Sequence, residues 1–132
     1  MYGPLRHRAT YEKALNQVRE ICLAFPEAHE VEAWGHPTFR AGKKMFAGFG
    51  EDADGLTIGL AMGYERQEEL LNDERFFPTP YAARLGWVSL HIDSKTDYTE
   101  LRGLIQEAYR QVALKRMLKA LDDQMENRRS KT

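Results

Sequence analysis

The chain lacks several features that would assign it to a special class of protein. Only one of its 132 residues is cysteine, so no disulfide can form within the chain. No apolar run approaches the roughly 20 residues that a membrane-spanning helix needs, and no hydrophobic signal segment follows Met1. We therefore expect a cytoplasmic protein without membrane contact.

Net charge is also almost absent, because 19 lysines and arginines are offset by 20 aspartates and glutamates, giving −1. A protein that binds nucleic acid through phosphates needs basic residues to neutralise them. The composition therefore disfavours an obligate nucleic-acid-binding protein, and only a local basic patch can serve that role.

No signature of catalysis or cofactor binding is present. Gly48 and Gly50 are followed by Ala53, where a dinucleotide fingerprint needs its third glycine, and no helix opens there. Cys22 lies on an apolar helical stripe, which favours core packing because a reactive thiol needs exposure and a lowered pKa. We predict no catalytic residue and no cofactor.

Two sets of residues contain possible metal ligands, but the residue spacing favours neither as a metal site. Aligning Asp52, Asp54 and Gly55 with a calcium-binding EF-hand loop puts Ala61 at the position of the final acidic ligand. A second set comprises His29, Glu30, Glu32 and His36, but ligands at strand spacing must share one face to meet. We predict no metal.

The composition itself is that of a globular domain, with 42% hydrophobic, 30% charged and 11% aromatic residues. We predict a single domain over residues 1–132. Residues 1–9 show no apolar periodicity and are predicted to be a flexible lead-in whose Arg6, His7 and Arg8 form a solvated tail or a basic arm.

Two segments have helical periodicity. The first begins at Thr10 and ends before Pro26, and its apolar residues recur at three- and four-residue steps. The second begins at Asp97, which forms a capping box with Glu100. No glycine or proline follows Val112, so we predict that this helix continues and that residues 114–132 form an extended C-terminal helix and basic tail.

Four segments have the pattern of strands: 29–34, the hairpin 34–50, 56–62 and 87–92. In the hairpin, Gly42 and Lys43 fit a type II′ turn, which would place Ala41 opposite Lys44 and Phe39 opposite Phe46. Residues 76–86 are predicted to be irregular and to cross a sheet edge, because proline cannot complete a strand ladder. We predict an α+β fold with an antiparallel sheet of about five strands and helices packed on one face.

Ordered blocks of the sequence resemble the MmcQ/YjbR family of small bacterial proteins. The matching residues are Gly35–Arg40, Lys44–Ala47, Arg75–Phe77, Pro80–Tyr81, Gly86–Val88, Glu107–Arg110 and Lys115–Arg116. The resemblance implies a CyaY- or frataxin-like sandwich with a double-wing arrangement and DNA binding.

The chain departs from this family in two places. Leu114 stands where many members carry a proline, which predicts a longer last helix here. Residues 59–63 lack a lysine that relatives place at the end of that strand, which removes a phosphate contact.

These observations give a leading hypothesis, the weak binding of DNA or another polyanion through a cationic hairpin tip. The candidate nucleic-acid- or phosphate-binding residues are Arg40, Lys43, Lys44, Arg84, Lys115 and Arg116. The candidate pocket or stacking residues are Trp34, His36, Tyr81 and Trp87.

Alternative interpretations use the same segments. The aromatic residues 76–87 can form a patch for a protein partner or a homodimer. A small-molecule site or an enzyme around His36 and Arg40, closed by Tyr81 or Arg84, is the third interpretation. Trp34 and Trp87 are also candidates for the sheet–helix core, as are Phe39 and Phe46.

Overall fold

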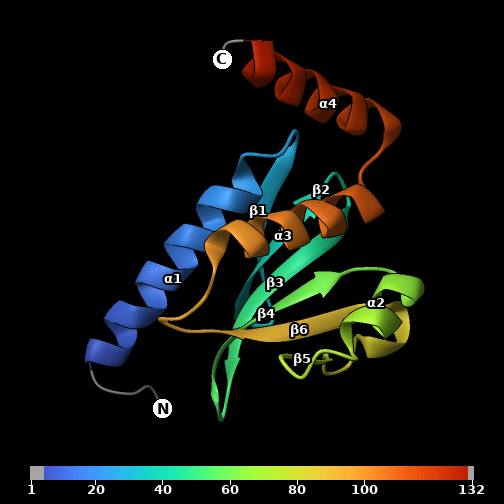
Figure 1. Cartoon of the computed structure of the whole chain (residues 1–132). Coiled ribbons are helices and arrows are strands. Elements are labelled where there is room, and N and C mark those ends of the chain that lie inside the picture. The colour runs from blue at the N-terminus through green and yellow to red at the C-terminus, as the bar shows by residue number, and fades with distance from the viewer. Residues whose placement is uncertain (1–4, 131–132) are drawn as a thin grey trace.

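The computed structural model describes residues 5–130, with side chains from residue 9 onward. Figure 1 shows how its helices and strands are arranged. In chain order the elements are α1 Leu5–Leu23, β1 Ala28–Ala33, β2 His36–Ala41, β3 Lys44–Asp52, β4 Gly55–Ala61, α2 Tyr64–Leu70, β5 Phe76–Pro78, the short 3-10 helix η1 Ala83–Leu85, β6 Trp87–Ile92, α3 Tyr98–Val112 and α4 Lys115–Ser130.

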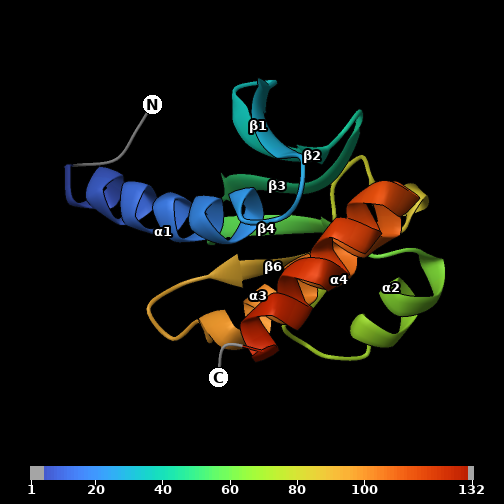
Figure 2. The same cartoon turned by 90° about the horizontal axis from the view of Figure 1, so that it is seen from above.

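The strands form one antiparallel sheet in the order β1-β2-β3-β4-β6-β5. Helix α3 packs on β3 and β4 and α1 packs on β1, so both helices cover the same face. The β1–β2 hairpin curls over at one edge of the sheet (Figure 2). This arrangement confirms the predicted α+β fold. The sixth strand is β5, which adds three residues to the edge at β6 within the segment predicted to be irregular.

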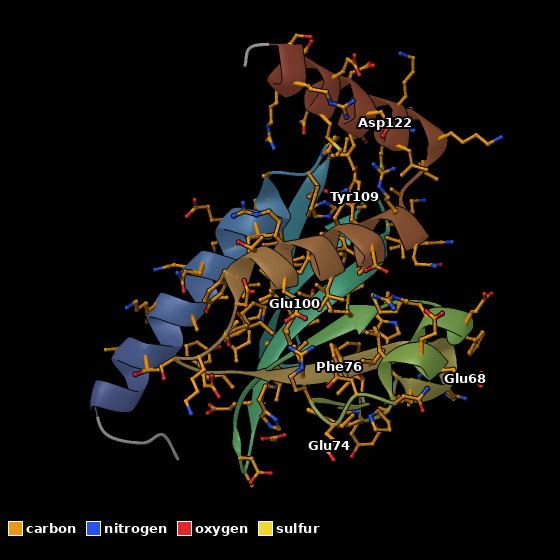
Figure 3. All side chains as sticks on the ribbon, viewed as in Figure 1. Glu68, Glu74, Phe76, Glu100, Tyr109 and Asp122 are labelled. Atoms are coloured by element: carbon orange, nitrogen blue, oxygen red, sulfur yellow. The ribbon has the colours of Figure 1, made fainter. Side chains whose placement is uncertain are left out.

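The core lies between the sheet and these helices and contains an aromatic cluster. The ring of Tyr109 on α3 stacks on Phe25 at 4.7 Å between centroids and meets Phe46 edge-on at 5.5 Å. Figure 3 labels Tyr109 on α3. Its hydroxyl donates a 2.7 Å hydrogen bond to the carbonyl of Pro26. Burial raises the pKa of Tyr109 to about 12, because the apolar surroundings disfavour the phenolate.

The first helix is longer than predicted. Its predicted apolar stripe is buried, including Val18 and Cys22, and burial raises the pKa of the Cys22 thiol. However, α1 begins at Leu5 and not at Thr10, so residues 5–9 are helical and not part of a lead-in. No glycine or proline separates Leu5 from Thr10, and polar residues can continue a helix without apolar periodicity. The rest of the predicted lead-in and the side chains of the predicted basic arm lie outside the described residues.

The β2–β3 hairpin has the predicted turn but a different register. Ala41 lies opposite Lys44 as predicted, and Gly42 has a φ of 63°. Phe39, however, lies opposite Ala47 and not Phe46, because the register shifts between Phe39 and Arg40. An extra residue in one strand re-aims a side chain. Here the irregularity lets Phe46 and Ala47 both be fully buried.

The last predicted helix is two helices. Ala113 has an extended conformation (φ −66°, ψ 145°), and α4 begins at Lys115. The carbonyl of Leu114 accepts hydrogen bonds from the amides of Met117 and Leu118, which starts the new helix. The break lets α4, which lies above α3 in Figure 1, change direction. Met117 and Leu121 on α4 are buried. The chain therefore breaks after Val112 although no glycine or proline follows that residue.

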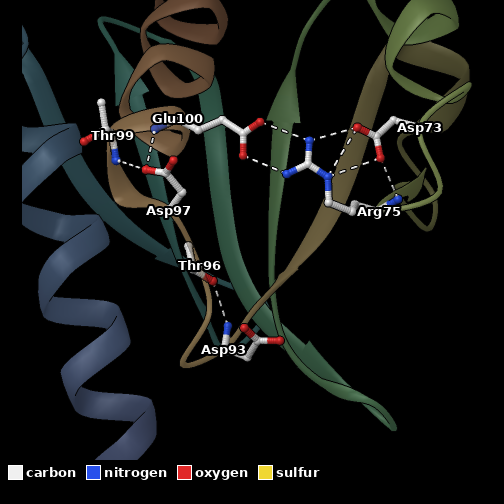
Figure 4. Close-up of polar contacts among 7 residues, drawn as sticks. All are labelled: Asp73, Arg75, Asp93, Thr96, Asp97, Thr99 and Glu100. Atoms are coloured by element: carbon white, nitrogen blue, oxygen red, sulfur yellow. Dashed lines mark hydrogen bonds and ion pairs between the residues drawn. The ribbon is translucent and has the colours of Figure 1, made fainter.

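Helix α3 begins where predicted. Oδ1 of Asp97 accepts hydrogen bonds from the amides of Thr99 and Glu100, which makes it the N-cap. In the predicted capping box the Glu100 carboxylate would bind the amide of Asp97. In the structure this carboxylate binds the guanidinium of Arg75, which also contacts Asp73 (Figure 4). These contacts attach the loop before β5 to α3. Among the described residues, no helix combines the length and apolarity that crossing a membrane requires.

Candidate binding groove on the open sheet face

The sheet face turned away from α1 and α3 has small residues at its centre. Gly48, Gly59 and Ser89 lie side by side on β3, β4 and β6. The residues next to these in sequence point to the opposite face. They are Phe49, Ile58 and Leu90, which are buried on the helix-covered face. A Cβ atom built on Gly48 would meet nothing within 4 Å. The absence of side chains therefore leaves this face hollow.

A groove of about 1090 Å³ occupies the hollow, and we call it the open-face groove. It reaches from the β1–β2 turn to the segment after β5, which belong to opposite edges of the sheet. Lys44 and Asp52, the first and last residues of β3, both line it. Since a strand rises about 3.3 Å per residue, the groove follows β3 for roughly 26 Å.

One end of the open-face groove is aromatic and adjoins cationic side chains. Strand pairing places Trp87 opposite Ala61, at the end of β4 that lies beside the start of β3. Tyr81, Leu85, Trp87 and Lys44 all line this part of the groove. We call it the lysine end.

The other end carries acidic and histidine side chains, and we call it the acidic end. Trp34, His36 and Asp52 line it, and the imidazole of His36 lies over Gly50, whose Cβ would be 3.5 Å from Nδ1. Beside it, Nε2 of His91 contacts both carboxylate oxygens of Asp52 at 3.0 Å. That hydrogen bond holds the pKa of Asp52 below its ordinary value.

Asp52, Asp54 and His91 offer ligand atoms within 4.8 Å of one another. A carboxylate and an imidazole are suitable ligands for a transition metal ion. In this structure the imidazole already has a partner, since His91 and Asp52 bind each other, and the ring stacks on Phe77 at 4.9 Å. The other set of possible metal ligands, which the sequence pattern did not favour, is divided, because Glu30 binds Arg19 while its strand neighbour His29 points to the opposite face.

Two aromatic side chains are held exposed at the edges of the groove by their backbone conformation. Trp34 has a φ of 52° and is 87% exposed, and Tyr81 has a φ of 65° and is 99% exposed. Bulky residues rarely adopt positive φ, and such strained positions cluster at ligand-binding sites. Trp34 therefore does not fill the core, and Trp87 is half-buried on the open face.

The predicted cationic residues fall into two groups. Among the described residues, Lys43, Lys44, Arg84 and Lys115 are exposed and make no ion pair. They come from segments near the lysine end: the β2–β3 turn, η1, and the start of α4. Helix α4 reaches the turn, since Cε of Met117 lies 3.1 Å from where a Cβ of Gly42 would stand.

The other two predicted cations are engaged differently. Both oxygens of Glu27 accept hydrogen bonds from the Arg116 guanidinium at 2.8 Å. Arg40 is half-buried, and its Nε is enclosed without a hydrogen-bond partner among the described residues. Neither residue lines the open-face groove, whereas the predicted stacking residues Trp34, His36, Tyr81 and Trp87 all do.

A smaller cavity of about 370 Å³ lies on the helix-covered side, between α2 and α3. Its charged residues neutralise one another: Arg66 binds Glu107, and Arg75 binds Asp73 and Glu100 (Figure 4). With its cations already paired, this cavity is a structural junction.

The floor of the groove was not predicted from the sequence. Gly48 and Gly59 line it and neither was a candidate, whereas Phe77 and Leu85 lie in the predicted aromatic patch of residues 76–87. A signal was present, because glycine at alternate positions 48 and 50 of a strand leaves one face bare.

The fold and the groove define a small α+β domain whose antiparallel sheet is covered by helices on one face and hollowed on the other. The YjbR family model matches residues 23–111, more than half of the chain. The chain therefore belongs to the YjbR family.

Two solved structures share the fold. Protein DR2400 of Deinococcus radiodurans, which has a DUF419 domain, superposes with a TM-score of 0.64 and 22% identity over 82% of this chain and 87% of that chain. A protein from Pseudomonas syringae gives a TM-score of 0.54 and 16% identity over 65% and 87%. No curated protein matches the sequence.

Proposed function

We propose that the chain is a binding module for nucleic acid, which it contacts through phosphates at the lysine end of the open-face groove. One observation carries this proposal. Lys43, Lys44 and Arg84 make no ion pair among the described residues, while Arg66, Arg75, Arg110 and Arg116 are all bound to carboxylates. Unpaired cations beside a groove give a local positive potential although the net charge is near zero.

The proposed contact is modest and without sequence preference, because few phosphates are neutralised. Three contacts predict a slope of log K against log salt near −2.7 on duplex DNA and near −2 on a single strand, from about −0.9 and −0.7 per phosphate. The acidic end repels phosphate, so the phosphate contacts are confined to the lysine end.

The test is a titration of labelled single-stranded and duplex DNA at several salt concentrations. Replacing Lys43 and Lys44 by alanine should flatten the salt slope by about two contacts and leave the fold intact, because exposed charges contribute little to stability. The matched control replaces Lys13 and Lys95, which are equally exposed and lie outside the groove. Absence of binding at low salt, or equal slopes for the two double variants, contradicts the proposal.

A second candidate function is protein association through the segment 76–87. Tyr81 and Leu85 are exposed apolar residues, and the Tyr64 hydroxyl anchors the segment by donating to the carbonyl of Arg84 at 2.7 Å. Light scattering over a range of concentrations tests this candidate. A dimer that Leu85→Glu dissociates supports it, and a monomer at all concentrations contradicts homodimer formation.

A further inference from the structure

We infer that the nucleic acid is single-stranded and that its bases enter the open-face groove, stacking on the aromatic side chains at its edges. This inference rests on the proposed function, which requires only phosphate contact. It adds the class of ligand and the surface that recognises the bases.

The size of the groove is the first argument. At about 1090 Å³ and roughly 26 Å along β3, it exceeds the usual range of about 300–1,000 Å³ for small-molecule sites. An extended ligand fills such a groove better than a compact one. The shape therefore favours a segment of a chain over a free nucleotide.

The chemistry of the lining is the second argument. Phe77, Tyr81, Leu85 and Trp87 contribute apolar surface, while Lys44 stands at the end of the groove. A duplex presents phosphates outward and hides the faces of its bases, so it cannot use this apolar surface. A single strand offers both phosphates for lysine and exposed bases for aromatic rings, which is the combination found in single-strand binding proteins.

The position of the aromatic residues is the third argument. Trp34 and Tyr81 are fixed in the left-handed region and project into solvent from opposite edges of the sheet. An exposed aromatic ring has its apolar surface in contact with water, and a stacked base would cover that surface. Their separation between the two ends of the groove suits a strand that crosses the sheet.

The first experiment compares three probes at one salt concentration: an oligothymidylate, an abasic strand with the same number of phosphates, and the same oligothymidylate in a duplex. Stacking contributes roughly five- to a hundredfold in affinity per base. We expect the abasic strand and the duplex to bind at least about tenfold more weakly than the oligothymidylate. Equal binding of the base-bearing and abasic strands overturns the inference while the proposed function stands; no binding of any probe overturns both.

Tryptophan fluorescence locates the bases. The chain has two tryptophans, Trp34 and Trp87, and both line the groove. We expect the oligothymidylate to quench their emission and the abasic strand to leave it nearly unchanged. In a Trp87→Phe variant, quenching of Trp34 by the oligothymidylate supports stacking at the edge, and binding without any quenching in the unsubstituted protein contradicts it.

Gly48→Val provides the sharpest variant, because its side chain would enter the floor of the groove, where a Cβ on Gly48 meets nothing within 4 Å. We expect at least about tenfold weaker binding of the oligothymidylate and unchanged binding of the abasic strand. The control is Gly103→Val, since Gly103 is exposed on α3 and also has no neighbour within 4 Å. Equal oligothymidylate affinity for folded Gly48→Val and Gly103→Val overturns the inference.

Discussion

The two faces of the sheet are built from the same strands and have opposite character. On the helix-covered face of β3, Phe46, Ala47 and Phe49 are buried. On the other face Gly48 leaves the backbone uncovered, and Gly50 lies beneath the imidazole of His36. Stability and binding are thus separated by the alternation of side chains along a strand. The difference teaches that one face can be altered for function while the other maintains the fold.

The largest expected effect is on the helix-covered face. Phe46→Ala should lower the free energy of unfolding by about 3 to 5 kcal/mol, because Phe46 is fully buried against Phe25 and Tyr109. Chemical denaturation measures the loss. Phe77→Ala on the open face is the comparison, and it should cost much less because Phe77 is half-buried. Equal losses would remove the distinction between the two faces.

The next effect concerns the docking of α4. Met117 is fully buried and reaches the β2–β3 turn at Gly42, so Met117→Ala should cost about 2 to 5 kcal/mol. Thermal and chemical unfolding measure this loss, with the half-buried neighbour Leu118→Ala as the control. A loss below about 1 kcal/mol for Met117→Ala would mean that α4 does not contribute to the core.

A smaller effect is expected on the open face. Gly48→Val should change the free energy of unfolding by no more than about 1 kcal/mol, the span of β-propensities, since a Cβ at this position meets nothing within 4 Å. Gly59→Val should cost more, because its Cβ would lie 3.3 Å from both Thr79 and Ser89. Denaturation of the two variants side by side tests the contrast. A Gly48→Val protein as destabilised as Gly59→Val would show that the groove floor is packed.

The smallest effect is the acid sensitivity of the acidic end. The hydrogen bond from His91 lowers the pKa of Asp52 from its ordinary 3.8, so the ionised carboxylate stabilises the fold above about pH 3.8. This contribution is lost as pH falls through the lower pKa of the folded state.

Because Asp52 is 41% exposed, solvent screening limits the contribution to well under about 1 kcal/mol. Asp52→Asn should therefore be slightly less stable than the unsubstituted protein near neutral pH, and the difference should vanish at strongly acidic pH. Urea unfolding across the acid range measures it. A difference that persists in strong acid would assign the loss to packing and not to ionisation.

Much of the helix-covered face could be predicted from local pattern. The stripe of α1 and the alternation in β6 are periodic, and periodic burial follows from backbone geometry alone. The Gly42–Lys43 turn was also predictable, because few residues accept positive φ. The register of the hairpin at Phe39 was not predictable from local pattern. The irregularity there depends on how Phe46 and Ala47 pack beneath helices that are distant in sequence.

The candidate groove was predictable only in its parts. Trp34, His36, Tyr81 and Trp87 could be selected from the sequence as residues able to bind, and all four line one groove. The exposure of Trp34 and Tyr81 could not be predicted, because an aromatic residue in a small domain is more often part of the core. The binding of Arg116 by Glu27 likewise joins positions 89 residues apart.

By itself, the sequence determined the periodic elements, the turn at Gly42 and the N-cap at Asp97, because each depends on interactions between near neighbours in the chain. Only the tertiary structure decided the register at Phe46, the break after Val112 and the position of Trp34 and Tyr81 along the same groove. These depend on packing between segments far apart in sequence, where one side chain's burial is set by the shape of another element.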